Sequence, residues 1–239
     1  MQDETKHYTR VGYKELLAML LTAAVIGFVM SFRDWGQDTI DVTQGVTTLI
    51  VASVTAFTLI LLRTAAQKWI ALKMGYLTTY TFHKYALPAS FFLAFFLNGL
   101  LPYVSPGNLH IQASKRLRLG TFRYGLNYED LALISLAAPA VCVLLMILVK
   151  PIYLATNNIL IHEVVQTTAA VAVFGLLPIN GQEGFNLIYF RRWLWVITFM
   201  FVGVYFLLIL ATSVFSYVIA VIVAIAAMWV YQAYLNSGD

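Results

Sequence analysis

Residues 45–62 read GVTTLIVASVTAFTLILL, a stretch without a charged side chain, and Arg63 follows it directly. A helix needs about 20 apolar residues, at about 1.5 Å per residue, to cross the hydrocarbon core of a membrane. Arg63 is expected about 27 Å along such a helix from Gly45, close to one membrane surface. The stretch therefore predicts a transmembrane helix that carries an arginine near its end.

The composition of the whole chain agrees with a membrane location. Of its 239 residues, 61% are hydrophobic and 11% are charged, and the mean hydropathy is +0.79. Soluble domains carry about 25% charged residues. The single cysteine, Cys142, lies in an apolar run, which excludes an intrachain disulfide and predicts a buried core residue. The chain is therefore predicted to be a polytopic membrane protein.

Further apolar runs divide the chain. One of them, residues 88–102, is bracketed by prolines and interrupted by Asn98 and Gly99, which disfavours a straight helix and favours a re-entrant element. We expect an all-α membrane protein with six transmembrane helices and this re-entrant element, or with the same run as a seventh span. The other runs are residues 16–32, 131–149, 164–177, 194–211 and 214–234.

The positive charges predict the orientation of the chain, because cytoplasmic loops are enriched in Lys and Arg. If the proline-bracketed run enters the membrane and returns, all of the 15 Lys and Arg residues except Arg33 and Lys150 lie on one side. This distribution predicts a multi-pass protein of the cell membrane with both termini in the cytoplasm. No linker or repeat divides residues 1–239, so we expect one membrane domain, with residues 1–15 as a cytoplasmic N-terminal segment and residues 105–130 as a basic cytoplasmic loop.

Four short segments stand in an order that resembles one known family. They are residues 63–75 (RTAAQKWIALKMG), 105–111 (SPGNLHI), 134–140 (ISLAAPA) and 174–184 (FGLLPINGQEG). In that order they resemble the zinc-binding helix, the Pro-Gly-Ala-Val segment, the Leu-Ala-Gly-Pro helix and the Asn-Leu-Leu-Pro…Asp-Gly motif of archaeal-type site-2 proteases, which are intramembrane zinc metalloproteases. The resemblance covers roughly residues 10–190. It implies an archaeal plasma membrane and a site-2-protease-like core with a short extended segment near residues 178–184.

The same resemblance implies that this chain has lost the metal. An active member has His-Glu-x-x-His in its zinc-binding helix, where two imidazoles hold zinc and the Glu activates a water. Arg63, Thr64 and Gln67 stand at those three positions, and Glu183 stands at the Asp that supplies the third ligand. Arg only donates hydrogen bonds, Thr64 is no carboxylate base, and a Gln amide is a poor zinc ligand. We therefore expect no catalytic residue, no metal and no cofactor.

Two further positions depart from the family, since Gly175 and Cys142 stand where asparagines are expected. Arg63 and Glu183 carry opposite charges at two positions that hold one metal in the family, so the resemblance implies that they lie close together. A guanidinium–carboxylate pair is then expected in place of the metal–carboxylate bond, with Gln67 one turn after Arg63 on the same helix face. The alternative is that Arg63 extends to the membrane surface and that Glu183 lies in a solvated loop.

The basic loop carries Lys115, Arg116, Arg118 and Arg123, with no acid before Glu129. These four side chains are candidates for contacts with anionic lipid or with an acidic partner. The alternative is that they only enforce the cytoplasmic placement of the loop. Neither this loop nor a pI near 9.1 amounts to a nucleic-acid-binding fold, so no nucleic acid is expected.

Binding without cleavage is the function that these observations predict. The expected protein is a catalytically inactive site-2-protease-like pseudoprotease, which binds or organises other membrane proteins through the family's groove for transmembrane segments. Two alternatives stay open. The first is a structural subunit of a larger membrane complex without such a groove, and the second is an enzyme that uses Glu183 as a base without metal. An open cleft beside the former zinc positions favours the pseudoprotease, whereas closed packing there favours the structural subunit.

Overall fold

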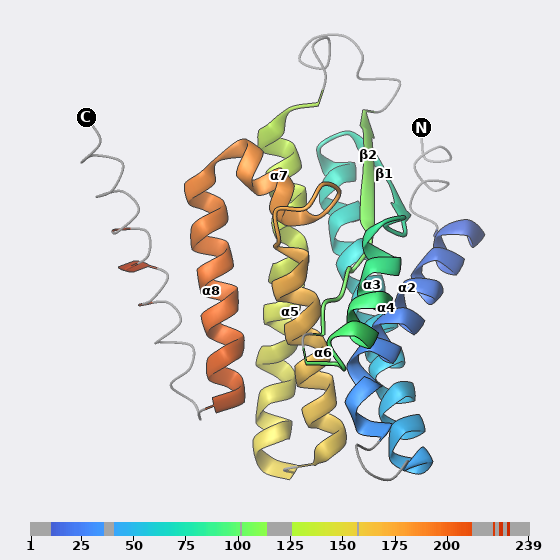
Figure 1. The fold of residues 1–239 in the computed structure, drawn as a ribbon. Helices are drawn as coiled ribbons and strands as arrows, with labels where there is room; N and C mark the ends of the chain where they lie inside the picture. The colour runs from blue at the N-terminus through green and yellow to red at the C-terminus, as the bar shows by residue number, and fades with distance from the viewer. Residues whose placement is uncertain are drawn as a thin grey trace.

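The computed structural model describes residues 11–35, 41–100, 102–113, 126–156 and 158–211, together with four isolated positions beyond residue 221. The chain is mostly helical, and its long helices lie side by side in one bundle (Figure 1). A two-stranded sheet and a short helix cover one end of the bundle, which we call the sheet end. The elements are α2 (Tyr13–Ser31), η1 (Phe32–Trp35), α3 (Val42–Lys73), β1 (Tyr76–Thr81), α4 (Ala86–Phe96), β2 (Asn108–Ala113), α5 (Tyr128–Thr156), α6 (Ile159–Gly175), α7 (Glu183–Phe190) and α8 (Arg192–Ala211).

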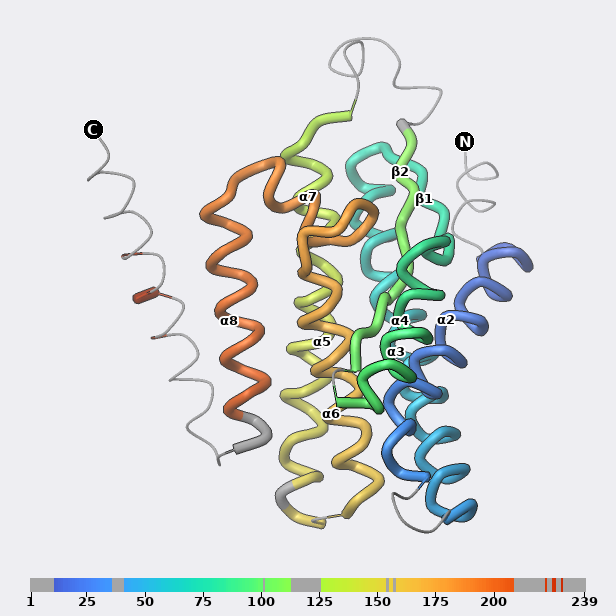
Figure 2. The backbone as a smooth tube through the Cα atoms, viewed as in Figure 1, coloured from blue at the N-terminus to red at the C-terminus, as the bar shows by residue number. Residues whose placement is uncertain are grey.

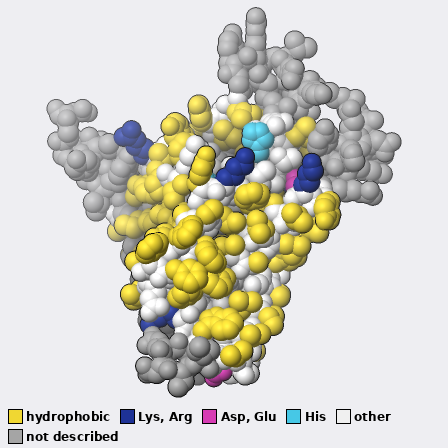
Figure 3. Space-filling model, turned by 45° about the vertical axis from the view of Figure 1, so that its right-hand side comes forward, with side chains coloured by type: hydrophobic (Ala, Val, Ile, Leu, Met, Phe, Trp, Pro, Cys, Tyr) yellow, Lys and Arg dark blue, Asp and Glu magenta, His cyan; other side chains and the backbone are white. Residues whose placement is uncertain are grey.

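Three segments of the described chain are long and apolar enough to cross a membrane: Tyr13–Trp35, Val42–Lys73 and Tyr128–Tyr153. These three helices are consistent with the prediction of a membrane protein, and much of the face that Figure 3 shows is apolar. The predicted number of six spans is not reached. The runs expected at 164–177 and 194–211 belong to the shorter apolar helices α6 and α8, and the run at 214–234 lies outside the described ranges.

The proline-bracketed run has the shape of a re-entrant element. Helix α4 ends in a tight turn, where Asn98 and Gly99 take positive φ angles of 49° and 67°, and the chain then returns along the bundle to β2 (Figure 2). Strands β1 and β2 are antiparallel, with Thr81 opposite Asn108. The segment between those two residues therefore leaves and returns at the same end of the bundle.

Helix α4 is held against α2 by aromatic side chains. Phe91 stacks on Phe28 with ring centroids 5.0 Å apart, and Phe95 meets Phe32 edge-on at 5.1 Å. Such pairs contribute about 0.5–1.5 kcal/mol each beyond the area that they bury. These aromatic contacts therefore keep α4 close to the bundle.

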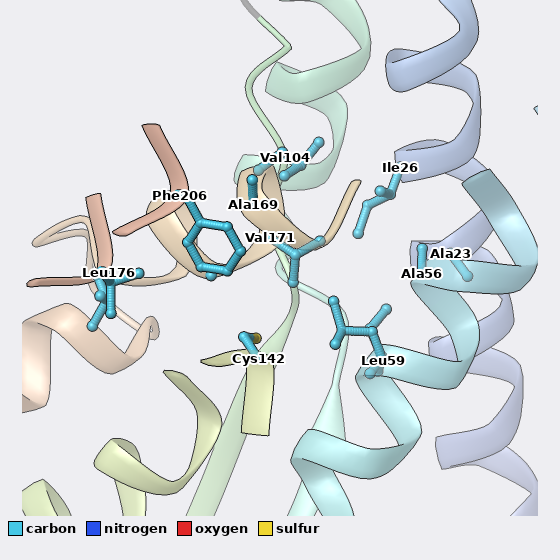
Figure 4. Close-up of a cluster of buried hydrophobic side chains, with 14 of the residues drawn as sticks. Ala23, Ile26, Ala56, Leu59, Val104, Cys142, Ala169, Val171, Leu176 and Phe206 are labelled. Carbon is cyan, nitrogen blue, oxygen red and sulfur yellow. The ribbon is translucent and has the colours of Figure 1, made fainter. Parts of the chain in front are cut away.

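Small side chains bring the helices of the bundle together. A Cβ atom added to Gly27 of α2 would overlap Ser53 of α3, so the two backbones cross in direct contact. Around this crossing lies the buried cluster of Figure 4, in which Ile26, Leu59 and Val171 meet from three different helices. Cys142 is fully buried in the same cluster, as predicted. Close packing of this kind is what associates helices in a bilayer, where lipid and side chains are equally apolar.

One local prediction is wrong. The segment expected to be extended near residues 178–184 instead forms a turn that leads into α7, with the Gln182 N–H donating to the Ile179 carbonyl at 3.0 Å. Gly181 takes a φ of 91°, a conformation that glycine adopts at little cost, and this reverses the chain. The extended backbone near Arg63 and Glu183 comes instead from β1, which the sequence did not predict, and from β2, which lies within the basic loop expected at 105–130.

Candidate site at the Arg63–Glu183 ion pair

Arg63 lies inside α3, ten residues before the helix ends at Lys73. The side chain of Asp41 caps the start of this helix by accepting from the Gln44 N–H at 3.1 Å, which satisfies one of the free N–H groups there. No proline or glycine interrupts the chain between Gly45 and Lys73, so the helix continues through the apolar stretch and past it. Arg63 is only 3% exposed at its position in this helix. The alternative in which its side chain extends to the membrane surface is therefore wrong.

The predicted ion pair is present. The Arg63 Nη2 group donates to Glu183 Oε1 at 2.6 Å, although the two residues are 120 positions apart in the chain. The Arg63 Nη1 group donates to the Val171 carbonyl of α6 at 3.4 Å, and the Gln67 amide approaches Glu183 Oε1 at 3.5 Å. The side chains of Arg63 and Glu183 are 4% and 13% exposed. The pair therefore joins α3, α6 and α7 in a place where each charge depends on the other for compensation.

Backbone positions explain why the pair fits. Glu183 is the first residue of α7, where the free N–H groups of the helix favour a negative charge. Gly175 ends α6 beside it, and a Cβ atom there would lie 3.0 Å from Arg63 Nη2 and 3.1 Å from Glu183 Oε2. A side chain at this position would therefore press on the pair. Gly175 makes room for the guanidinium, a role that its sequence position alone did not indicate.

The space around the pair is closed. A cavity of about 10 Å³ remains there, lined among others by Thr64, Tyr80 and Pro106. A cavity must offer about 10–15 Å³ to hold one water molecule. The site consequently has no room for a peptide segment.

Tyr80 closes the site from the sheet. Its hydroxyl group donates to the Pro106 carbonyl at 2.9 Å, which joins β1 to the returning chain of the re-entrant element. Burial raises the pKa of Tyr80 above its ordinary value, so the phenol stays protonated and keeps donating. Two of the family-like segments, the one with Arg63 and the one with Pro106, are thus brought together by a tyrosine outside both.

A second buried ion pair stands next to the first and was not predicted. Glu15 of α2 accepts from Lys68 Nζ of α3 at 2.6 Å and from the Tyr80 N–H of β1 at 3.1 Å. The two side chains are 12% and 7% exposed. Glu15 thereby satisfies one backbone donor at the open edge of the sheet and fixes that edge to the bundle. Lys68 was expected only as one of many cytoplasmic charges.

His83 fixes the turn that carries Glu183. Its Nε2 lies 2.6 Å from the Asn180 carbonyl, and its Nδ1 lies 3.1 Å from the Ala86 N–H. A carbonyl only accepts and a backbone N–H only donates, so the tautomer with its proton on Nε2 satisfies both contacts. The histidine therefore ties the start of the re-entrant helix to the turn at residues 179–181.

Gln182 secures the same turn from inside. It is 1% exposed, and its amide group approaches the hydroxyls of Tyr103 at 3.4 Å and Ser105 at 3.5 Å. Both hydroxyls belong to the returning chain of the re-entrant element. The turn before Glu183 is thus held on one side by His83 and on the other by Gln182, so the carboxylate is presented to Arg63 from a rigid segment.

The residues of the site do not fit a zinc ion. Within the described ranges no group of three or more His, Cys, Asp and Glu side chains converges. Thr64 is buried at the wall of the small cavity, Gln67 faces Glu183, and the guanidinium brings a fixed positive charge to the carboxylate. An added cation would be repelled by this charge and would find one carboxylate at most.

The predicted contacts of the basic loop concern Lys115, Arg116, Arg118 and Arg123. These four residues lie outside the described residues, and their contacts stay a prediction.

An open pocket of about 620 Å³ lies between α6 and α8, in the half of the bundle away from the sheet end. Its walls are mostly apolar, with Ala169 and Ala170 on α6 and Met200 and Gly203 on α8. A Cβ atom at Gly203 would meet no atom of the described residues within 4 Å.

No family model, curated protein or solved structure matches this chain.

Proposed function

We propose that this chain is a non-catalytic membrane protein of the site-2-protease type, which binds transmembrane segments of partner proteins. The single observation that carries the proposal is the 2.6 Å contact between Arg63 and Glu183. These residues stand at two positions to which the resemblance assigns one zinc ion. The ion pair takes the place of metal–carboxylate bonding and keeps α3 and α7 in register without a metal.

The chemistry of the site argues against hydrolysis. Peptide hydrolysis in a membrane requires an activated water, which a metal or a free base must supply. Here Glu183 Oε1 is already bound by the guanidinium, Thr64 has no basic group, and the cavity holds about 10 Å³. The idea of an enzyme that uses Glu183 as a base is therefore the least supported of the three.

The pocket between α6 and α8 supports the binding role. Its volume of about 620 Å³ and its mostly apolar walls, which include the small residues Ala169, Ala170 and Gly203, suit a hydrophobic helix more than a polar ligand. Alanine and glycine allow the backbone of an incoming helix to come close, as at Gly27 within the bundle itself. The proposed groove is thus displaced from the former zinc positions toward α8.

Aromatic and basic side chains at the sheet end support the proposed orientation. Lys73 lies 3.5 Å from the Trp69 ring, Arg191 lies 5.9 Å from the Trp193 ring, and Tyr128 stacks on Tyr189. Such residues gather at membrane surfaces, with basic ones favoured on the cytoplasmic side. We infer six spans, a re-entrant α4 and both termini in the cytoplasm, with the sheet end at the cytoplasmic surface.

A structural subunit of a larger complex is the second candidate. The closed packing around the ion pair favours a structural subunit. Within the described residues, no cleft that could receive a partner helix lies beside Arg63 and Glu183. The two candidates differ in whether the pocket between α6 and α8 receives a partner.

Site-specific photo-cross-linking in native membranes separates these candidates. A benzophenone amino acid at Met200, which faces the pocket, is expected to give severalfold more cross-linked partner than the same group at Leu148, which is exposed on α5 outside it. Equal yields at the two positions would contradict the proposal. So would cross-links that stay within the chain, for example to residues 214–234.

A further inference from the structure

A second pocket, of about 1020 Å³, opens at the sheet end where α2, β1 and the turn at residues 179–181 meet. In contrast to the groove beside α8, it carries polar and charged side chains. Figure 3 shows a histidine beside basic side chains near that end of the molecule. Its charged or polar walls include Lys14, Glu15, His83, Lys84, His110 and Asn180.

Among the residues that the structure describes, the lysines of this pocket have no acidic partner. Lys14 and Lys84 are exposed, and neither forms an ion pair with any described residue. Glu15 is the acid among the lining residues, and it is already bound by Lys68 and by the Tyr80 N–H. Because Lys68 neutralises Glu15, Lys14 and Lys84 leave the described lining of the pocket with an excess of about two positive charges that a ligand can meet.

Hydrogen-bonding side chains line the same pocket as these charges. His110 of β2 is exposed and stands opposite Thr79 of β1 in the sheet, so both side chains leave the same face. His83, with both ring nitrogens engaged, holds the wall of the pocket in place. An imidazole and a hydroxyl next to two ammonium groups are a donor set suited to phosphate oxygens.

Two aromatic side chains place the pocket at the membrane surface. Tyr13 is 79% exposed and precedes Lys14, and Tyr85 is 83% exposed and follows Lys84. Tyrosines with this exposure next to lysines are typical of the headgroup level of a bilayer. A lipid of the surrounding bilayer would therefore have its headgroup at the level of this pocket.

We propose that this pocket binds a phosphate group, as the headgroup of an anionic lipid presents it. Lys14 and Lys84 supply the opposing charge, and His110 and Thr79 supply hydrogen bonds. The site is separate from the predicted contacts of the basic loop at Lys115–Arg123, and it does not depend on whether a partner occupies the groove beside α8.

The test uses the purified full chain in a neutral detergent and follows its melting temperature during addition of phosphatidylglycerol or phosphatidylcholine. We expect phosphatidylglycerol to raise the melting temperature at lower concentration than phosphatidylcholine. Each basic residue near an anionic group contributes about 1 kcal/mol, so Lys14→Gln with Lys84→Gln is expected to raise the half-saturating concentration about thirtyfold.

A matched variant removes the same charge elsewhere at the sheet end. Lys73→Gln with Arg192→Gln lies outside the pocket and is expected to leave the half-saturating concentration within about threefold of the parent. Lys14→Arg with Lys84→Arg keeps the charge and is expected to retain binding, which controls for a variant that folds poorly. Equal losses in both Gln pairs, no loss in the pocket pair, or no preference for phosphatidylglycerol would overturn the proposal.

Inorganic phosphate added without lipid distinguishes the two sources of the phosphate group. No effect at millimolar concentration assigns the site to a lipid headgroup, as we expect. Stabilisation by phosphate alone that disappears with Lys14→Gln and Lys84→Gln keeps the phosphate site but overturns its assignment to lipid.

Discussion

Replacing Arg63 with Leu is expected to lower the free energy of unfolding by about 3–5 kcal/mol, because the buried carboxylate of Glu183 then loses its compensating charge. Glu183→Leu is expected to cost a similar amount, since it leaves the guanidinium of a residue that is 3% exposed without its partner. The double change replaces both charges with apolar side chains and is expected to cost less than either single change. The measurement is unfolding in detergent, analysed as a double-mutant cycle.

The exposed arginine Arg192 provides the control for this cycle. Arg192→Leu removes the same charge from a position at the start of α8, and we expect a change within about 1 kcal/mol. Strictly additive losses for Arg63→Leu and Glu183→Leu would contradict the coupling that the 2.6 Å contact implies.

Glu15→Leu is expected to have the second large effect, a loss of about 3–5 kcal/mol in the free energy of unfolding. The change leaves the ammonium of Lys68 nearly buried without its partner, and it removes the acceptor of the Tyr80 N–H at the edge of β1. Both consequences act in the same direction, because an unsatisfied buried donor adds its own cost. Thermal unfolding in detergent measures the loss.

Glu129→Leu is the matched control for Glu15. Glu129 is an exposed acid in the first turn of α5, where the side chain forms no ion pair with a described residue. We expect this change to shift stability by at most about 0.5 kcal/mol. If Glu15→Leu shifts stability no more than Glu129→Leu does, the pair with Lys68 is not structural.

The parts of the fold that could be predicted depend on local composition. Long apolar runs predicted the helices of the bundle, and two prolines with Asn98 and Gly99 predicted the re-entrant shape, because each signal lies within one segment. The Arg63–Glu183 pair was predicted across 120 positions only through the family resemblance, which assigns both positions to one metal. The charges alone would not have indicated which acidic residue pairs with Arg63.

The features that were missed depend on contacts between distant segments. Strand β1 pairs with residues that lie 27 to 37 positions further along the chain, from Thr81↔Asn108 to Tyr76↔Ala113, and its sequence, YLTTYT, carries no turn signal that marks a hairpin. Glu15 and Lys68 are 53 positions apart and looked like ordinary membrane-surface charges. The turn at residues 178–182 is held by His83, which contacts the Asn180 carbonyl, and by Gln182, whose partners Tyr103 and Ser105 lie in the returning chain of the re-entrant element. The local sequence pattern does not predict contacts between such distant residues.

Helix length explains why fewer spans are recognised than were predicted. Helix α6 has 17 residues and is thus about 26 Å long, somewhat shorter than the ~30 Å hydrocarbon core. The turn that follows it is only partly buried, with Pro178 and Asn180 exposed and Gln182 buried. Six spans therefore stay a proposal, whereas three long apolar helices belong to the described fold.

The most direct test of the central claim is a zinc measurement on the native chain and on a variant with restored ligands. The variant carries Arg63→His, Thr64→Glu, Gln67→His and Glu183→Asp, which recreates the ligand set of the family at residues that the structure brings together. After dialysis against a weak chelator, elemental analysis is expected to find no stoichiometric zinc in the native chain and about one zinc per chain in the variant. A native chain that holds about one zinc, or a folded variant that takes up none, would contradict the account.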